Sequence, residues 1–392
     1  MPTTINMGSM GRHLSRIGPQ LINVLKGNVA LSGDLLALGK KLYPLFFGVA
    51  GLSPDDPFPI QLVFDQNRDR NIFPYPYELI ADDSGAQICR QQGAMIRVLD
   101  KEIAPRLLTL PLRVLLIIAS PQTGGYDHLN TEMHQQAIRH EWAYFDKLVY
   151  FDTITGPNTL EKLRQKLTTS NPYHIVHIVA HGSDNFNGGG GAIIFADENG
   201  GANPLDGNHL YAELTTLTGQ TPHLVILNSC LTGGGQKVEA NQFAVVTWQL
   251  LVSGIPAVVA MQAKVLEENA AAAAARFYHL LLAGHSLDKA VLGMRTSLVY
   301  QWYAPILALQ KGYDCHFFTP ETRTYLHTLH EFNEQVKSLY TEWQQNKTPQ
   351  QYQALRECLR RDNPDILPLI HNHDELAEAI LYQMAEKLNV LM

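Results

Sequence analysis

Between Leu112 and Leu309 the chain alternates short, largely apolar runs with longer stretches of helical periodicity. A run of four to eight aliphatic residues without polar alternation predicts a strand that is buried on both faces. Strands of this kind, separated by helices, are typical of a parallel sheet that is covered by helices on both sides. Six such runs are present: Leu112–Ala119, Leu148–Phe151, His174–Ala180, His223–Asn228, Ala257–Met261 and Ile306–Leu309. We therefore expect an α/β fold with a six-stranded, mainly parallel sheet, and with helices near residues 130–144, 159–168, 205–217, 238–252 and 267–299.

The chain before this region has a different character. Residues 1–32 are mostly polar and form an N-terminal segment, and helical spacing over 33–48 predicts a helix. The alternation in Ile60–Phe64 and the Pro-rich, aromatic segment Phe73–Ile80 predict short antiparallel strands and a turn. Residues 94–99 predict one more strand.

After Pro320 the composition changes again. Residues 321–392 are rich in Glu, Gln, Lys and Leu, and their apolar positions recur at helical spacing, which predicts a small all-α appendage. We therefore expect three parts: residues 1–32, a main domain over 33–320, and a helical interaction domain over 321–392. The appendage either packs on the main domain or docks a regulatory protein partner.

Composition excludes several classes of protein. Hydrophobic residues make up 45% of the 392 residues, enough for a large core, and the formal net charge of −7 disfavours sequence-independent nucleic-acid binding. The four cysteines are far apart in sequence, which disfavours a disulfide framework and a structural zinc site. No secretory leader and no run of about 18 apolar residues is present, so we expect a cytoplasmic protein without a membrane span.

Two predicted strands end in residues with nucleophilic or basic side chains. The strand His174–Ala180 ends at His181, and the strand that begins at His223 ends at Cys230. Ligands bind outside the carboxyl ends of the strands in open α/β sheets, so neighbouring strands would bring both side chains into one crevice. An imidazole beside a thiol can take its proton and so produce a nucleophilic thiolate. Gly182 lacks a Cβ, so its N–H and that of Cys230 could together form an oxyanion hole.

Other polar motifs favour structural interpretations. His177 and His181 are four residues apart on a strand, about 13 Å at roughly 3.3 Å per residue, which is too far for one zinc ion. We expect His174 and His177 to be structural, and we expect neither a metal nor a cofactor. Gly188–Gly191 precedes a predicted β-hairpin, and Gly233–Gly235 predicts a loop beside the crevice. Neither glycine run has the fingerprint of a nucleotide-binding loop.

Several short motifs follow one another over roughly residues 33–320. They are the leading helix Leu36–Phe47, the segment Tyr75-Pro76-Tyr77-Glu78-Leu79, the pair His181-Gly182, the hairpin Gly191–Asn199, the strand end Leu227-Asn228-Ser229-Cys230, the segment Gly254–Ala260, and two helical pieces, Arg276-Phe277-Tyr278 and Ala283-Gly284-His285-Ser286 with Ala290. In these motifs and in their order the sequence resembles the CHAT-type caspase-like cysteine peptidases, relatives of caspases and separase.

The resemblance implies an activity. It implies that His181 is the general base and acid, that Cys230 is the nucleophile, and that a protein or peptide substrate binds as an extended strand. In many CHAT proteins such appendages recruit partners or sensors, often in bacterial antiviral defence or regulated cell death. Leu231 stands where the family often has a polar residue after the cysteine.

Three further residues are candidates for the substrate pocket. Asn228, Gln262 and Asp314 follow or end predicted strands and are candidates for the pocket. No arginines converge there, which disfavours an Asp at P1, the substrate residue before the cleaved bond, and leaves a small, apolar or basic residue at P1.

Two alternatives to a peptidase remain. One is a catalytically silent caspase-like scaffold or signalling protein, and the other is a nucleotide-binding α/β protein.

Overall fold

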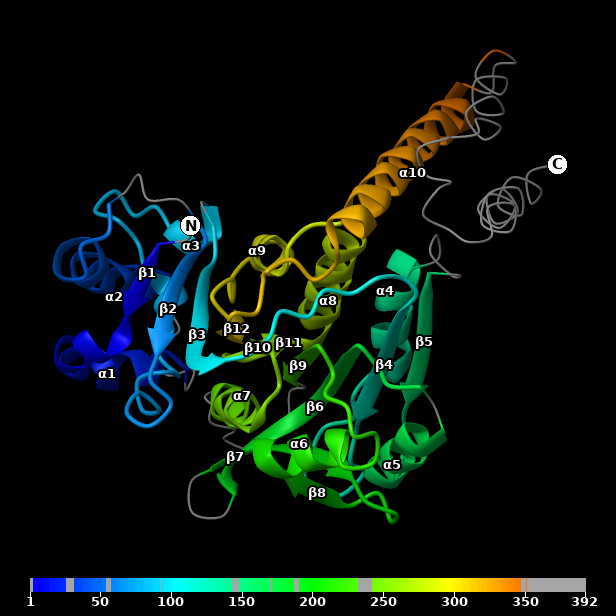
Figure 1. Ribbon diagram of the computed structural model, residues 1–392, viewed down its shortest axis with the longest axis horizontal. Coiled ribbons are helices and arrows are strands. Elements are labelled where there is room, and N and C mark those ends of the chain that lie inside the picture. The colour runs from blue at the N-terminus through cyan, green and yellow to red at the C-terminus, as the bar shows by residue number, and fades with distance from the viewer. Residues whose placement is uncertain are drawn as a thin grey trace.

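A computed structural model describes the protein over residues 3–25, 32–53, 58–91, 93–142, 148–169, 171–186, 190–231, 242–346 and 350. A single twisted sheet crosses the molecule, and a long helix extends away from it (Figure 1). The predicted α/β fold is confirmed.

The six predicted strands form one part of this sheet. They are β4 (Leu112–Ala119), β5 (Val149–Ile154), β6 (Ile175–Phe186), β9 (Leu224–Leu231), β10 (Ala257–Met261) and β12 (Pro305–Lys311). Their order is β5-β4-β6-β9-β10-β12. The first five run parallel, and β12 is antiparallel to β10. The prediction of a mainly parallel sheet is confirmed. Among these six strands, β12 alone runs in the opposite direction.

The sheet continues beyond β12 with three strands from the N-terminal part of the chain. These are β3 (Met95–Glu102), β2 (Ile60–Phe64) and β1 (Thr4–Asn6), and each is parallel to its neighbour. The expected antiparallel pairing of Ile60–Phe64 is therefore wrong, and Phe73–Ile80 contains a 3₁₀ turn, η3 (Tyr77–Leu79), instead of a strand. The alternation of β2 reflects burial on alternate residues, and such a pattern says nothing about the direction of the neighbouring strand.

The second half of β6 belongs to a small antiparallel sheet that extends from the main sheet. After Ala180, β6 leaves the main sheet and pairs with β7 (Gly190–Ala196), which pairs in turn with β8 (Ala202–Leu205). The predicted hairpin after Gly191 is thus confirmed. Its turn contains Gly200 at a φ of 78°, a conformation that suits glycine.

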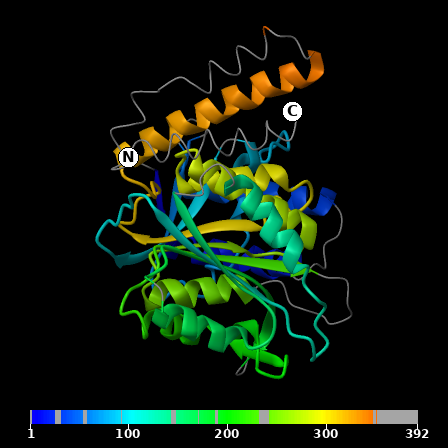
Figure 2. The ribbon, with the colours of Figure 1, turned by 90° about the vertical axis from the view of Figure 1, so that its right-hand side faces the viewer.

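Helices cover both faces of the sheet (Figure 2). One face carries α4 (Thr131–Trp142), α8 (Glu267–Leu282) and α9 (Leu287–Ser297), and the other carries α5 (Thr159–Thr169), α6 (Gly207–Thr215) and α7 (Gln242–Ser253). A short helix, α3 (Ile88–Gln91), lies near α9. The two-sided covering explains why the central strands contain apolar residues without alternation.

The N-terminal segment belongs to the same core. Within it α1 (Gly11–Leu25) follows β1 and a 3₁₀ turn, η1 (Met7–Ser9), and Ile5 and Leu14 are buried. The expected helix over 33–48 is α2 (Ser32–Pro44) followed by a π-helical turn, η2 (Leu45–Val49). Glycine is required at Gly39 of α2, because a Cβ there would clash with the carbonyl oxygen of Leu79.

The long helix is α10 (Pro320–Asn346), where the helical appendage was expected to begin. Its first turns belong to the main core, since Tyr325, Leu326 and Leu329 are at most 2% exposed. Its remainder extends away from the domain (Figure 1). The predicted stripe of Leu376, Ile380, Met384 and Leu388 lies outside the described residues. No helix in the described part of the chain has the length and apolarity needed to cross a membrane.

Candidate active site

His181 and Cys230 occupy matching positions on neighbouring strands. In the register of the sheet, Ala180 of β6 pairs with Ser229 of β9, so each predicted catalytic residue follows directly after this pair. Cys230 itself pairs with Val265 of a two-residue strand, β11 (Val265–Leu266). The structure therefore brings the backbones of the two residues together at the carboxyl edge of the parallel strands.

The imidazole of His181 is held by a backbone carbonyl. Its Nε2 lies 2.8 Å from the carbonyl oxygen of Asp127, and its ring centroid lies 5.3 Å from that of Tyr126. A carbonyl can only accept a hydrogen bond, so Nε2 carries the proton and Nδ1 keeps its lone pair. The side chain is 8% exposed, and this burial lowers the pKa of His181, an effect that the Asp127 carbonyl partly offsets. His181 is thus a neutral imidazole whose Nδ1 can accept a proton.

The contact with Asp127 could not be found from the sequence. The interacting group is a backbone carbonyl in the loop between β4 and α4, and every residue has one. The Asp127 carbonyl contacts His181 only because this loop lies next to that residue in the folded chain.

Gly182 and the backbone of Cys230 are the predicted oxyanion donors. Gly182 pairs with Ile193 of β7, and Cys230 pairs with Val265 of β11. Both residues thus lie in strand pairs just beyond the last paired position of the parallel strands β6 and β9. Their role as oxyanion donors stays a prediction.

The three predicted pocket residues are not brought together. Asn228 lies two residues before Cys230, is 1% exposed, and donates from Nδ2 to the carbonyl of Ala270 over 3.1 Å. Gln262, after β10, is fully buried and bonded to other protein groups.

The expectation for Asp314 needs correction. Because β12 is antiparallel to β10, its carboxyl end lies beside Ala257, at the edge of the sheet opposite to Cys230. Asp314 follows that end, and its carboxylate accepts a hydrogen bond from the N–H of His316. The expectation treated the end of every strand as one edge of the sheet, which holds only for parallel strands.

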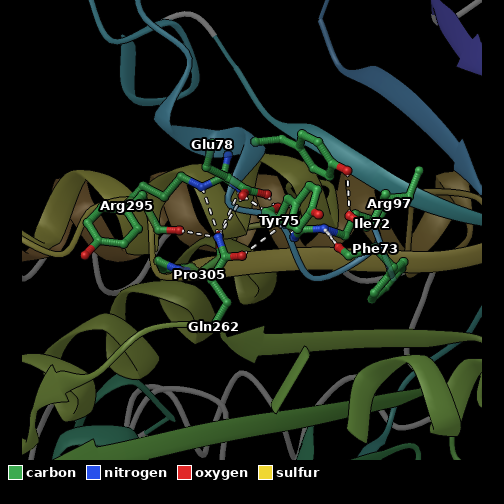
Figure 3. A network of polar contacts seen from close by, with 10 residues as sticks. Ile72, Phe73, Tyr75, Glu78, Arg97, Gln262, Arg295 and Pro305 are labelled. Atoms are coloured by element: carbon green, nitrogen blue, oxygen red, sulfur yellow. Dashed lines mark hydrogen bonds and ion pairs between the residues drawn. The ribbon is translucent and has the colours of Figure 1, made fainter. Parts of the chain in front are cut away.

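A buried polar network lies around Gln262 (Figure 3). Glu78 lies 3.0 Å from Nη1 of Arg97 and 3.6 Å from Nη2 of Arg295, and all three side chains are at most 1% exposed. Gln262 accepts from Arg97 over 3.0 Å and donates to Glu78 over 2.7 Å. Arg295 also donates to the carbonyl of Pro305. The network joins the Tyr-Pro-Tyr-Glu-Leu segment and β3 to the carboxyl end of β10. The expectation that no arginines converge near the predicted pocket residues is therefore wrong at Gln262, although both arginines are fully buried and bonded to protein groups.

The side chains of the other two histidines of β6 contact neighbouring protein groups, as expected for structural residues. His177 is fully buried and its Nδ1 lies 3.2 Å from the hydroxyl of Tyr278, while burial lowers its pKa to about 3. Nδ1 of His174 accepts from the N–H of Arg113 over 3.1 Å. Within the described residues, no group of three or more His, Cys, Asp or Glu side chains is placed to hold a metal ion.

Two of the other thiols are poorly suited to act as nucleophiles. Cys89 is fully buried, which raises its pKa to about 12, and burial also raises the pKa of Cys315. A thiol with a raised pKa provides little thiolate at neutral pH. Cys358 lies outside the described residues.

Comparison with solved structures finds only distant similarity. Separase from Saccharomyces cerevisiae, in complex with securin, shares 12% identity at a TM-score of 0.39, over 68% of this chain and 16% of the separase chain. The Drosophila initiator caspase Dronc shares 11% identity at a TM-score of 0.35, over 58% of this chain and 96% of its own. The chain spans only a small part of the length of the separase chain. No curated protein matches its sequence.

A family model gives the decisive match. The model of the CHAT domain matches residues 84–304, which is more than half of the chain and includes both His181 and Cys230. The match lies inside the region over which the sequence motifs resemble the CHAT-type peptidases, and it confirms that resemblance. The chain belongs to the CHAT domain family.

Proposed function

We propose that the protein is a cysteine endopeptidase that cleaves a protein substrate with a dyad of His181 and Cys230. The observation that carries the proposal is the register of β6 and β9, in which the two residues follow one paired position. The fixed Nε2–H of His181 supports it, because the contact with the Asp127 carbonyl leaves Nδ1 as the proton acceptor.

The proposed reaction has two stages. Nδ1 of His181 takes the proton of the Cys230 thiol, and the thiolate attacks the carbonyl carbon of the scissile peptide. The negative charge on the oxygen is stabilised by the N–H groups of Gly182 and Cys230. The tetrahedral intermediate then collapses, the C–N bond breaks, and His181 returns the proton to the leaving amine. Water, deprotonated by His181, hydrolyses the thioester and releases the acid product and the thiol.

We propose a small or apolar residue at P1. Leu266, which pairs with Leu231 beside the nucleophile, is 50% exposed and presents an apolar side chain next to the site. A basic P1 residue would need a buried carboxylate, and Asp314, the residue expected to supply it, lies at the opposite edge of the sheet. A cleavage profile with strict Asp at P1 would contradict this preference.

We also propose a regulatory setting, on the family resemblance. The peptidase would serve in a bacterial defence or cell-death system, with the segment 321–392 as the site of a regulatory protein partner. The extension of α10 away from the main domain supports such a role for the later part of that segment (Figure 1).

The proposal is tested by mapping the new N-termini that the protein generates in a lysate. Wild type is expected to generate cleavage products that Cys230→Ala and His181→Ala do not generate, although both variants fold. Iodoacetamide is expected to modify Cys230 faster than Cys89 and Cys315, and His181→Ala should slow that reaction.

One control variant and one contradicting outcome make the result decisive. Cys315→Ala should leave cleavage unchanged, since the burial of that thiol raises its pKa. If wild type and Cys230→Ala gave the same N-termini while Cys230 reacted no faster than the buried thiols, the protein would be a catalytically silent scaffold.

A further inference from the structure

We infer that Glu267 is a positioning residue for His181, and that it acts through the loop between β4 and α4. The inference deepens the proposed function, on which it depends for the role of His181 as the base. Glu267 is the first residue of α8, and it lies outside the motifs of the predicted dyad.

The first step is how the loop is held. Oε1 of Glu267 accepts a hydrogen bond of 2.6 Å from the N–H of Asn130. One residue earlier, the N–H of Leu129 donates to Oγ of Ser120 over 2.9 Å. Two residues before that, the carbonyl of Asp127 contacts Nε2 of His181. The loop that orients the imidazole is therefore attached at two consecutive backbone N–H groups, and one attachment is Glu267.

The second step is where Glu267 lies relative to the nucleophile. It directly follows β11, whose two residues pair with Cys230 and Leu231. At the other end of the same segment, Gln262 is fixed by Glu78 and Arg97. The segment 262–267 is thus held at both ends by polar contacts, which are buried at Gln262 and partly buried at Glu267. It pairs with the backbone of Cys230 in its middle and supports the loop over His181 at its end.

The third step is the burial of this carboxylate. Glu267 is 8% exposed, and desolvation raises its pKa. Its neighbour Glu268 is exposed and lies in the same first turn of α8, so it has the same favourable interaction with the helix dipole without this desolvation. The burial of Glu267 is therefore compensated by its specific contacts, the N–H of Asn130 and, at 3.3 Å, Nε2 of His134. Because burial lowers the pKa of His134 to about 4, the second contact is made by a neutral imidazole.

The experiment measures the orientation of His181 directly, besides activity. Proteins labelled with ¹⁵N-histidine are compared by NMR, with the His181 signals assigned from His181→Ala. Wild type is expected to show the Nε2–H tautomer. Glu267→Ala should give a mixture of tautomers and lower both kcat and the rate of Cys230 alkylation by up to about 100-fold, with KM little changed. Glu267→Gln keeps an acceptor for Asn130 and should restore the tautomer and most of the rate.

Glu268→Ala is the matched control, and it should behave as wild type in each measurement. An unchanged tautomer and kcat in Glu267→Ala would overturn the inference, and so would a Glu267→Gln variant as impaired as Glu267→Ala, because the negative charge would then be what matters. If Glu267→Ala does not fold, Ser120→Ala removes the other attachment of the loop; a shifted tautomer in that variant supports the inference and an unshifted one overturns it. If wild type cleaves nothing but its tautomer depends on Glu267, the proposed function fails and the positioning role stands.

Discussion

Burial determines the working pH range of His181. Desolvation lowers its pKa below the usual value of about 6.5, so the imidazole stays neutral, and able to accept a proton, at pH values where an exposed histidine is already charged. We therefore expect the acidic limb of the pH profile of kcat/KM to have its midpoint below pH 6.5. The alkylation rate of Cys230 should fall along the same acidic limb as His181 becomes protonated. A midpoint above pH 6.5 would contradict the buried, neutral form of His181.

Glu78 neutralises one of two fully buried arginines. Its removal in Glu78→Ala would leave Arg97 and Arg295 without a carboxylate in the core. Loss of one partner of a buried ion pair costs about 3–5 kcal/mol of the free energy of unfolding. Urea denaturation should detect this loss. The control is Glu102→Ala, whose pair with Lys311 is exposed and screened by solvent, so its loss should change the free energy of unfolding far less. Equal effects of the two substitutions would contradict the role of the network.

The first turns of α10 and the rest of that helix should contribute differently to the stability of the protein. Tyr325, Leu326 and Leu329 are part of the main core, whereas the helix continues well beyond it. A chain that ends at Pro320 should lose several kcal/mol of stability, since burial of each large apolar side chain contributes about 1.5–3 kcal/mol. A chain that ends at Phe332 keeps these turns and should unfold near the wild-type temperature.

The comparison of these two truncations also bears on the proposed partner. If the chain that ends at Phe332 cleaves peptides normally but escapes regulation in cells, the docking role belongs to the residues after 332. If both truncations melt at the wild-type temperature, the first turns of α10 do not contribute to the core as their burial indicates.

For the whole molecule, buried histidines should make stability depend on pH. Burial lowers the pKa of His134 to about 4 and of His177 to about 3, and both side chains are fully buried. Because these values lie below the unfolded value of about 6.5, the unfolded chain binds protons first, and stability falls as the pH drops below 6.5. Each histidine should cost about 2 kcal/mol between pH 7 and pH 5. The midpoint of urea denaturation should decrease from pH 7 to pH 5, and His177→Asn should make this decrease in stability smaller. His140→Asn, at an exposed position, should not.

The sequence predicts those parts of the molecule that depend on local patterns. The six central strands are predicted because each is a short, largely apolar run, and His181 and Cys230 because each lies at the carboxyl end of one. The direction of β12 could not be predicted, since periodicity reports burial and not orientation, and the misplacement of Asp314 followed from this. The contributions of Asp127 and Glu267 were missed because they arise from a loop conformation and a long-range contact.

The position of β12 also has a consequence for the order in which the protein can fold during synthesis. The strands β1, β2 and β3 leave the ribosome before the other strands of the sheet, but among the described strands they join the rest of the sheet only through β12, which begins at Pro305. Until that strand is made, the edge of β3 that faces away from β2 has no partner in the sheet, and the closing contact joins residues as far apart as Ile96 and Leu307. Contacts between residues so far apart in sequence form slowly, and an unpaired strand edge is prone to aggregate. Folding of the nascent chain should therefore be completed late, when β12 enters between the two earlier parts.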